Sequence, residues 1–365
     1  MKRNNKIKVL FIFLLVFLLS GCTKILKDDN KKVVTYDADI VCNSCSESCK
    51  LLEDEFNSLK NNESLSKEDE EKLNDLEESL NRCKDDCNKK CDSAKKNQTG
   101  QSLTQNILCK PTNSDVIEIY EKYGVNISKL DNCSDFNLFS NYEGLWASLF
   151  VKPLAWIIIK FGLILNNYGL SLIIISILIR VLLMPITRKT AMQSENIKKA
   201  QPEIDRINKK YENKLDNESQ LKKNQEILFI YKKYDINPLS SCLFAFIQIP
   251  LLFAFLEAIN RTPAIFEEKL LGFHMGVTPL LAITSGDFKY LFIVVILGLV
   301  TYYSLNLSRA DMAGSIDSKQ SRFMTIFMLV FIVFASFNVS TAICLYWIST
   351  SLFTILQNLL VKKEK

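Results

Sequence analysis

The sequence has few of the residues that carry enzymatic chemistry. His274 is the only histidine among 365 residues, and the Gly-x-x-x-x-Gly-Lys-Ser/Thr pattern of a phosphate-binding loop does not occur. The chain therefore offers little for covalent catalysis and implies no ATP site. We expect a protein that is not an enzyme and that holds no cofactor or metal.

Charge is missing from several apolar runs of about 18 residues or more, the length that crosses the hydrocarbon core of a bilayer. The stretch 325–361 is uncharged and would be over ~50 Å long as one helix, against a core of about 30 Å, so it must fold back near Asn338-Val339-Ser340. We predict five membrane-spanning helices, at residues 167–186, 239–259, 290–306, 323–338 and 340–360.

One charge interrupts this pattern. Arg180 is the only charged residue more than a turn inside any of the strong candidate spans. A charge within the bilayer costs from a few to more than ~10 kcal/mol unless it finds water or a partner. Arg180 therefore marks a functional site.

The first 21 residues combine a basic start, an apolar middle and small residues, the pattern of an export signal. They lead into Leu19-Ser20-Gly21-Cys22, which resembles the bacterial lipobox, where the cysteine becomes the lipidated first residue. We expect a lipoprotein signal peptide at 1–21 and a lipid such as palmitate on Cys22. An uncleaved anchor helix is the alternative. In both cases the following residues begin outside the cell.

Positive charge supports this orientation in the bacterial cell membrane. Segment 187–238, an expected cytoplasmic helical hairpin, holds 12 Lys/Arg, and the cytoplasmic tail 362–365 is basic. The outer segment 260–289 holds only Arg261, Lys269 and Lys289. This distribution follows the positive-inside rule. The net charge of +5 is therefore a signal of topology, and it does not indicate DNA binding.

Cysteines gather in segment 22–143, which we expect outside the cell, where disulfides form. Two apolar seams with steps of three and four residues, typical of coiled-coil helices, cover 42–59 and 73–91. When two such helices fold back on each other, the position numbers of facing residues sum to a constant. This register predicts a disulfide-stapled helical hairpin with the bonds Cys42–Cys91, Cys45–Cys87 and Cys49–Cys83.

Cys109 and Cys133 are left to pair with each other. Zinc binding is the competing interpretation, because Cys42-x-x-Cys45 alone suits zinc, although no histidine is near. The function of the hairpin is not readable from its residues, and a stable spacer or a partner-docking module fits it equally.

Segment 144–165 precedes the first span. Lys152, Pro153 and Lys160 argue against a full crossing, while Trp146 and Trp156 suit the water boundary. We expect an amphipathic helix on the outer membrane surface, with a sixth span as the alternative.

Four motifs follow one another in the second half of the chain. They are Asn166-Asn-Tyr-Gly-Leu-Ser ahead of Leu178-Ile-Arg180-Val-Leu-Leu-Met-Pro185, then Gln201-Pro-Glu-Ile, then Asn237-Pro-Leu-Ser-Ser-Cys242 through Gln248-Ile-Pro250, and last Cys344-Leu-Tyr-Trp347 through Gln357. Together, over about residues 145–361, they resemble the YidC/Oxa1/Alb3 membrane protein insertases. The lipoprotein start is similar to the Gram-positive bacterial form.

The resemblance implies an insertase core at 166–361, in which five helices surround a hydrophilic groove that is open to the cytoplasm and to lipid. Arg180 falls on the groove arginine of the family. The implied function is the insertion and folding of membrane proteins without ATP. The implied partners are nascent membrane proteins and the lipid bilayer, with the ribosome and the Sec translocon as further expectations.

Three more groove residues are expected from the same resemblance. Ser176 lies one helical turn before Arg180, although it could instead bond its own helix backbone. Trp347 matches an aromatic position that faces the substrate path, or it is an interfacial or core residue. Gln248 is polar inside the second span, where it faces inward or bonds a neighbouring helix.

The chain departs from the family pattern at Ser340 and Ala342, where the family usually has a proline and a glycine. The resemblance therefore does not fix the residues of the turn before the last span. A small-solute or anion transporter or channel, with Arg180 as the binding site, is the alternative function. Against it, the spans show no internal repeat. A lipid-anchored surface receptor would leave the basic cytoplasmic hairpin without a purpose.

Overall fold

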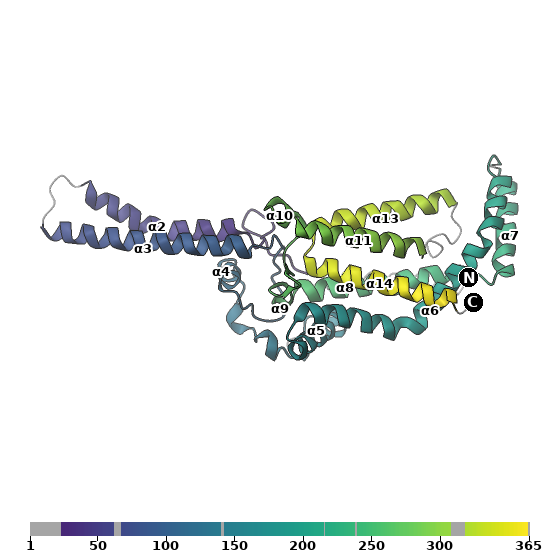
Figure 1. Ribbon diagram of the computed structural model, residues 1–365, viewed down its shortest axis with the longest axis horizontal. Coiled ribbons are helices and arrows are strands. Elements are labelled where there is room, and N and C mark those ends of the chain that lie inside the picture. Colours follow the sequence, from purple (N-terminus) through teal and green to yellow (C-terminus); the bar gives the residue numbers. More distant parts are fainter. Residues whose placement is uncertain are drawn as a thin grey trace.

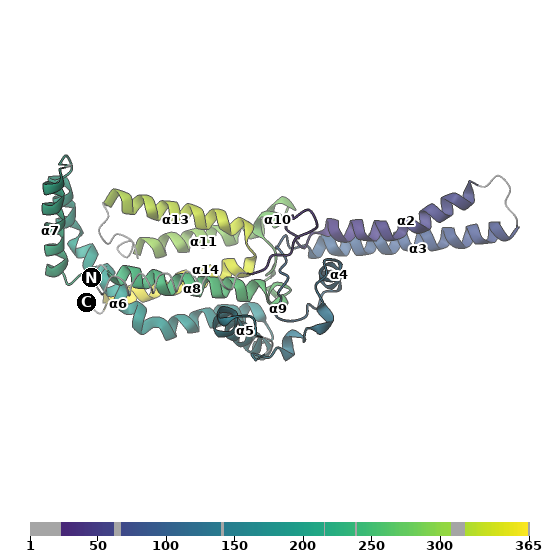
Figure 2. The ribbon, with the colours of Figure 1, turned by 180° about the vertical axis from the view of Figure 1, so that it is seen from behind.

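The computed structural model of the protein describes residues 23–61, 67–139, 142–214, 216–237, 239–307 and 318–363. Figures 1 and 2 show an elongated helical molecule, with an arm of two helices at one end, a bundle of long helices in the middle and a short hairpin across the other end. The predicted signal peptide and Cys22 lie outside the described residues. The prediction of a mostly helical protein with long apolar helices is confirmed.

The arm consists of the antiparallel helices α2 (Ala38–Lys60) and α3 (Lys67–Asn97). The Asp37 carboxylate caps α2 by accepting a hydrogen bond from a first-turn backbone N–H at 3.1 Å. Residues 62–66, which connect the two helices, lie outside the described part of the chain.

The apolar seams of α2 and α3 face each other. Leu76 and Leu80 are buried in the seam, whereas Leu51, one position off it, is 77% exposed. Three cysteine pairs join the helices with Cα–Cα distances of 4.8, 5.5 and 5.9 Å, in the order Cys42–Cys91, Cys45–Cys87 and Cys49–Cys83. These pairs are the ones that the antiparallel register predicts.

Extended segments complete the domain predicted at 22–143, which we call the outer domain after its predicted position. The sequence pattern predicted only helices in it. Residues 23–36 pair with residues 99–105, for example where Leu26 N–H donates to Leu103 O at 2.8 Å. Helix α4 (Ser114–Lys122) packs its buried face against this layer. Cys109 and Cys133 are paired, with a Cα–Cα distance of 4.8 Å.

Five long helices of the described residues form the bundle, and each overlaps one predicted span. They are α6 (Tyr168–Lys210), α8 (Leu239–Asn260), α11 (Lys289–Leu307), α13 (Ser318–Asn338) and α14 (Thr341–Lys363). The chain turns between α13 and α14 at Val339 and Ser340, within the stretch where the length argument requires a reversal.

Length and composition allow four described helices to cross a membrane, at Ala147–Leu165, Tyr168–Lys189, Lys289–Leu307 and Thr341–Val361. Gln248–Asn260 and Thr325–Asn338 are shorter apolar helices among the described residues. The first of the four is the segment with two sequence interpretations. It forms a π-helical turn at Ala147–Val151 and helix α5 (Lys152–Leu165). Figures 1 and 2 show α5 nearly end-on, whereas the bundle helices run along the horizontal axis.

Helix α6 is longer than predicted. It continues past Pro185 and Pro202 to Lys210, so the first span and the first half of the hairpin are one helix. The expected start of a separate hairpin at 187 has no break in the structure. Helix α7 (Asn217–Lys233) folds back on this extension, and their buried apolar residues form a small core of their own.

Short elements close the outer end of the bundle between α8 and α11. They are α9 (Pro263–Phe266), strands β1 (Lys269–Leu270) and β2 (Phe273–His274), and α10 (Pro279–Thr284). The two strands are joined by Leu271 and Gly272, both with positive φ, as a two-residue hairpin of type I′ requires.

Arg261 lies at the outer end of α8 and is fully buried. Its Nη1 contacts the Glu257 carboxylate at 3.1 Å, its Nη2 contacts the Glu143 carboxylate, and its Nε donates to the Asn106 carbonyl at 2.5 Å. One side chain therefore joins the outer domain, the segment before α5 and the end of α8.

Two further residues complete this network. Lys152, buried at the start of α5, lies 3.5 Å from the Glu143 carboxylate, and the Trp146 indole N–H donates to Glu257 at 2.9 Å. Two cations thus face two carboxylates, so the buried charges are balanced and hydrogen-bonded, as burial requires.

The cysteine pairing gives the first prediction. Reduction of the denatured protein should raise the number of titratable thiols by eight, because four pairs are bonded in the structure. Thiol titration with and without reductant measures this number. Eight thiols already reactive before reduction would contradict the pairing, and bound zinc in that sample would favour the metal interpretation.

Removal of Arg261 gives the second prediction. Arg261→Ala should lower the free energy of unfolding by about 3–5 kcal/mol, because it leaves the buried Glu257 carboxylate without its cation. Thermal unfolding in mild detergent measures the loss. Lys289→Ala is the matched control, since its 2.9 Å pair with Asp287 is 48% and 43% exposed and should contribute less than about 1 kcal/mol. Equal losses of unfolding free energy in the two variants would contradict a larger contribution from the buried network.

Candidate functional site

Helices α6 and α14 run parallel through the bundle, because both begin at the same outer loop. Tyr168 N–H at the start of α6 donates to Glu268 at 3.1 Å, and Thr341 N–H at the start of α14 donates to Val277 O at 2.9 Å. Near the other end, the Gln357 side-chain amide donates to the Thr187 hydroxyl at 2.8 Å.

This last bond fixes the register of the two helices. It pairs Thr187 with Gln357, and the same offset places Ser176 level with Tyr346 and Arg180 level with Thr350. The three α6 residues and their three α14 counterparts are all buried. We call these six residues the polar seam: Ser176, Arg180 and Thr187 on α6, and Tyr346, Thr350 and Gln357 on α14.

Arg180 is the only charged member of the polar seam, and it is 6% exposed. Side chains of a helix point back toward its N-terminus, which directs the guanidinium to the level of Tyr346. The Tyr346 hydroxyl and the guanidinium do interact electrostatically. No carboxylate pairs with Arg180 within the described residues, and its Nε has no hydrogen-bond partner there.

This situation contrasts with Arg261, whose charge meets two carboxylates. An unpaired guanidinium at membrane depth requires water or a polar ligand.

Ser176 is buried one turn from Arg180, and its hydroxyl donates to Leu172 O in its own helix at 2.6 Å. Of the two sequence interpretations, this bond is the one expected for a serine that satisfies itself on the helix backbone. The proximity to Arg180 still holds, because both residues share one face of α6.

Trp347 and Gln248 are both half-buried. Trp347 packs against the apolar clusters on both sides of α14, next to the seam residue Tyr346. Gln248 lies on α8 beyond residues 239–247, whose side chains lie outside the described part of the chain. The structure therefore brings Arg180 and Ser176 together, while Trp347 and Gln248 occupy neighbouring helices.

Sequence reasoning missed the roles of Tyr346, Thr350, Thr187 and Gln357 in the seam. A signal was available, because positions 346, 350 and 357 repeat the spacing of 176, 180 and 187. Equal spacing of polar residues on two helices indicates a shared face only when the helices run parallel, and that could not be read from the sequence. No group of three His, Cys, Asp or Glu side chains suited to a metal ion occurs among the described residues.

The seam register gives the third prediction. Thr187→Val and Gln357→Leu should each destabilise the protein, with a coupling energy of about 0.6 kcal/mol and at most about 1.7 kcal/mol, the range of interhelical hydrogen bonds in membranes. A double-mutant cycle on thermal unfolding measures it. Thr354→Val combined with Gln357→Leu is the control, because Thr354 bonds its own helix at Thr350 O. A coupling no larger than in this control would contradict the register.

The chain is similar to membrane protein insertases over its second half. The model of the family described as the 60Kd inner membrane protein matches residues 160–365. The membrane protein insertase YidC of Oceanobacillus iheyensis is 33% identical over 241 residues, which are 64% of this chain and 91% of that protein. The membrane protein insertase YidC 2 of Bacillus anthracis is 33% identical over 233 residues, which are 63% of this chain and 87% of that protein.

The membrane protein insertase MisCA of Bacillus subtilis is 33% identical over 218 residues, 60% of this chain and 79% of that protein. The polar seam lies inside the residues that the family model matches, and the disulfide-linked arm lies before them. The resemblance inferred from the four motifs is confirmed, and the chain belongs to the 60Kd inner membrane protein family, the family of the YidC membrane protein insertases.

Proposed function

We propose that this insertase works through a hydrophilic groove centred on Arg180, beside the polar seam of α6 and α14. The observation that carries the proposal is the buried guanidinium without a counter-charge in the described chain. A water-filled groove, open to the cytoplasm and to lipid, would hydrate this charge. Arginine stays charged at every physiological pH, so the groove would hold a constant positive potential partway into the bilayer.

An incoming polypeptide would use this potential in two steps. A polar or acidic segment enters the groove and loses less hydration there than in lipid, because the seam and the guanidinium accept and donate hydrogen bonds. The apolar segment that follows then moves sideways into the bilayer, driven by the hydrophobic effect. No covalent step and no ATP are needed for this sequence of events.

Exposed apolar surface on the bundle supports a lateral exit. Large side chains such as Val330 and Phe334 on α13 are 61% and 71% exposed, which suits contact with lipid. Helix α5 lies across the outer end in Figure 1 and is held there by Lys152 in the Arg261 network, as expected for an interfacial helix at 144–165. This arrangement supports a groove that is closed toward the outside.

The orientation follows from charge. The α6–α7 hairpin and the tail at 362–365 would lie in the cytoplasm, and the arm would lie outside, anchored near the membrane by the lipid on Cys22. The basic α6–α7 hairpin is the surface we assign to contact with ribosomes that carry nascent membrane proteins. Cooperation with the Sec translocon would use the lipid-exposed helices.

Charge removal in the groove gives the fourth prediction. In reconstituted vesicles, Arg180→Ala should lower insertion of a single-span substrate with an acidic outer tail roughly tenfold, which corresponds to ~1.4 kcal/mol. Arg180→Lys should retain most of the activity, because it keeps the charge. Protease protection of the tail measures insertion, and a substrate with a neutral tail is the control. Unchanged insertion by Arg180→Ala for every substrate would contradict the electrostatic role.

The path itself is tested by crosslinking from a photoreactive residue at position 347 to a ribosome-stalled nascent chain. Position 182 is the matched control, since Leu182 points to lipid from the helix that carries Arg180. Crosslinks from 182 without any from 347 would place the substrate outside the proposed groove.

A further inference from the structure

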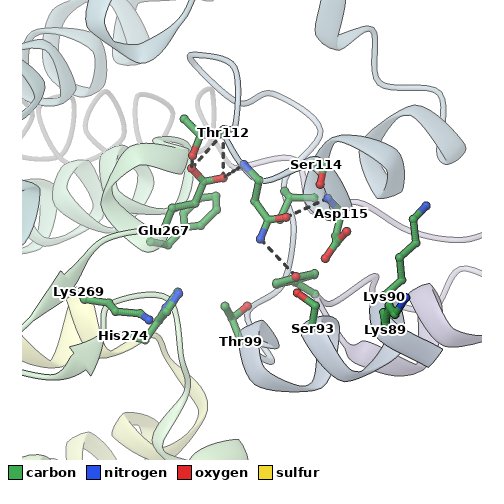
Figure 3. Close-up of a pocket in the computed structure, with 14 residues that line it drawn as sticks. Lys89, Lys90, Ser93, Thr99, Thr112, Ser114, Asp115, Glu267, Lys269 and His274 are labelled. Carbon is green, nitrogen blue, oxygen red and sulfur yellow. Dashed lines mark hydrogen bonds between the residues drawn. The ribbon is translucent and has the colours of Figure 1, made fainter. Parts of the chain in front are cut away.

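A cavity of about 700 Å³ lies where the outer domain meets the insertase core. Its volume is in the range of pockets that bind small ligands or short peptide segments. Figure 3 shows its two walls: Lys89, Lys90 and Ser93 come from α3, whereas Lys269 and His274 come from the β1–β2 hairpin of the core.

The two carboxylates in the wall already have partners. Glu267 accepts hydrogen bonds from the backbone N–H groups of Thr112 and Asn113 at 3.0–3.1 Å. Asp115 lies beside the Tyr36 hydroxyl, and burial together with this carboxylate raises the pKa of Tyr36 to about 12. Tyr36 therefore stays protonated, and both carboxylates are held in the wall by neutral donors and keep their negative charge.

The lysines, by contrast, are free to act on a ligand. Lys90 and Lys269 have no ion-pair partner within the described residues, and the Lys89 pair with Asp86 is 3.9 Å long and 79% and 77% exposed. Such an exposed pair neutralises little charge. The N-terminus of α4, at Ser114–Val116, adds its positive helix dipole to the same cavity.

His274 adds no charge at physiological pH. Burial lowers its pKa to about 4, and the nearby Lys269 acts in the same direction. With His274 neutral, the cavity wall holds three lysines, drawn from both sides, against the two carboxylates Glu267 and Asp115, and the N-terminus of α4 adds positive potential. The wall also includes the apolar groups Val116 and Phe266. A carboxylate on an extended polypeptide matches this mixture of cations, hydroxyls and apolar surface.

The cavity is also connected to the helix that carries Arg180. The Asn167 side-chain amide donates to Lys269 O at 3.0 Å, and Tyr168 N–H donates to Glu268 at 3.1 Å. The cavity wall at Lys269 thus borders the outer start of α6. A segment that has crossed the membrane beside α6 emerges next to this wall.

We propose that the junction cavity binds acidic segments of substrate proteins after these segments reach the outer side of the membrane. The proposal rests on the proposed groove function for the origin of its ligand, and it gives the arm a role in receiving substrates. Most lining residues precede residue 160, where the family match begins, so the site depends on the outer domain of this chain.

Peptide binding to the purified full-length protein tests this proposal. The protein is placed in nanodiscs of neutral phosphatidylcholine, and the probe is a fluorescent octapeptide with four aspartates. The same peptide with asparagines is the ligand control. We expect the acidic peptide to bind at least about tenfold more tightly than its amide counterpart, and added salt to weaken this preference.

Charge reversal locates the site. Lys90→Glu with Lys269→Glu should weaken binding of the acidic peptide at least about tenfold, because it places like charges around the carboxylates. Lys95→Glu with Lys122→Glu changes the net charge equally at exposed positions outside the cavity, and should change binding less than about twofold. Protection of the eight paired cysteines checks that the variants fold.

Equal binding of both peptides, or equal loss in both double variants, would overturn the proposal. So would binding that appears only with phosphatidylglycerol nanodiscs and never with the peptide, since the ligand would then be a lipid phosphate. The binding measurement needs no insertion. A chain whose insertion depends on Arg180 but that binds no acidic peptide would refute this inference alone, and the converse result would refute the groove alone.

Discussion

The buried contacts of Arg261 connect parts of the chain that are far apart in sequence. Its guanidinium reaches Glu143 before α5, Glu257 on α8 and the backbone of the outer domain at Asn106. Removal of Arg261 would leave the buried Glu257 carboxylate without its cation, which is costly, so the three parts hold one another in place. The position of α5 across the outer end, the closure of the bundle and the docking of the arm all depend on this balance of charges.

A second buried arginine, Arg180, lies in the opposite kind of electrostatic environment. Arg261 is surrounded by carboxylates and contributes to structure, whereas Arg180 faces a tyrosine hydroxyl and meets no counter-charge in the described residues. The potential of a paired charge is largely cancelled by its partner, whereas the potential of an unpaired charge extends into its surroundings. The contrast separates a structural arginine, Arg261, from the arginine that we propose acts on a passing chain, Arg180.

Much of the architecture could be predicted from local patterns. The three- and four-residue steps of Leu and Cys along the arm gave the pairing register, because an antiparallel helix pair leaves only one way to align both seams. The length of 325–361 required a reversal, which the structure has at Val339 and Ser340. The first span was predicted at 167–186, and its helix α6 continues without a break past Pro185 into the hairpin segment, to Lys210.

Contacts between distant segments could not be predicted in the same way. The extended pairing of 23–36 with 99–105 has no periodic signal, and the Glu143–Arg261 contact depends on where the outer domain docks. The polar seam shows the same limit. Its spacing is visible on each helix, but the partner of Gln357 becomes known only when α6 and α14 are placed side by side. Local periodicity determines elements, and the arrangement of elements determines the site.

The long-range contacts of the outer domain have a consequence for the order in which the protein is made. The arm is synthesised before the bundle, and disulfides such as its three pairs persist only in an oxidising compartment. Asn106 and Leu108, however, bond to Arg261, which enters the chain about 150 residues later, after α8 has been made. The arm and its neighbouring segments therefore exist for a time without the contacts that hold them against the bundle.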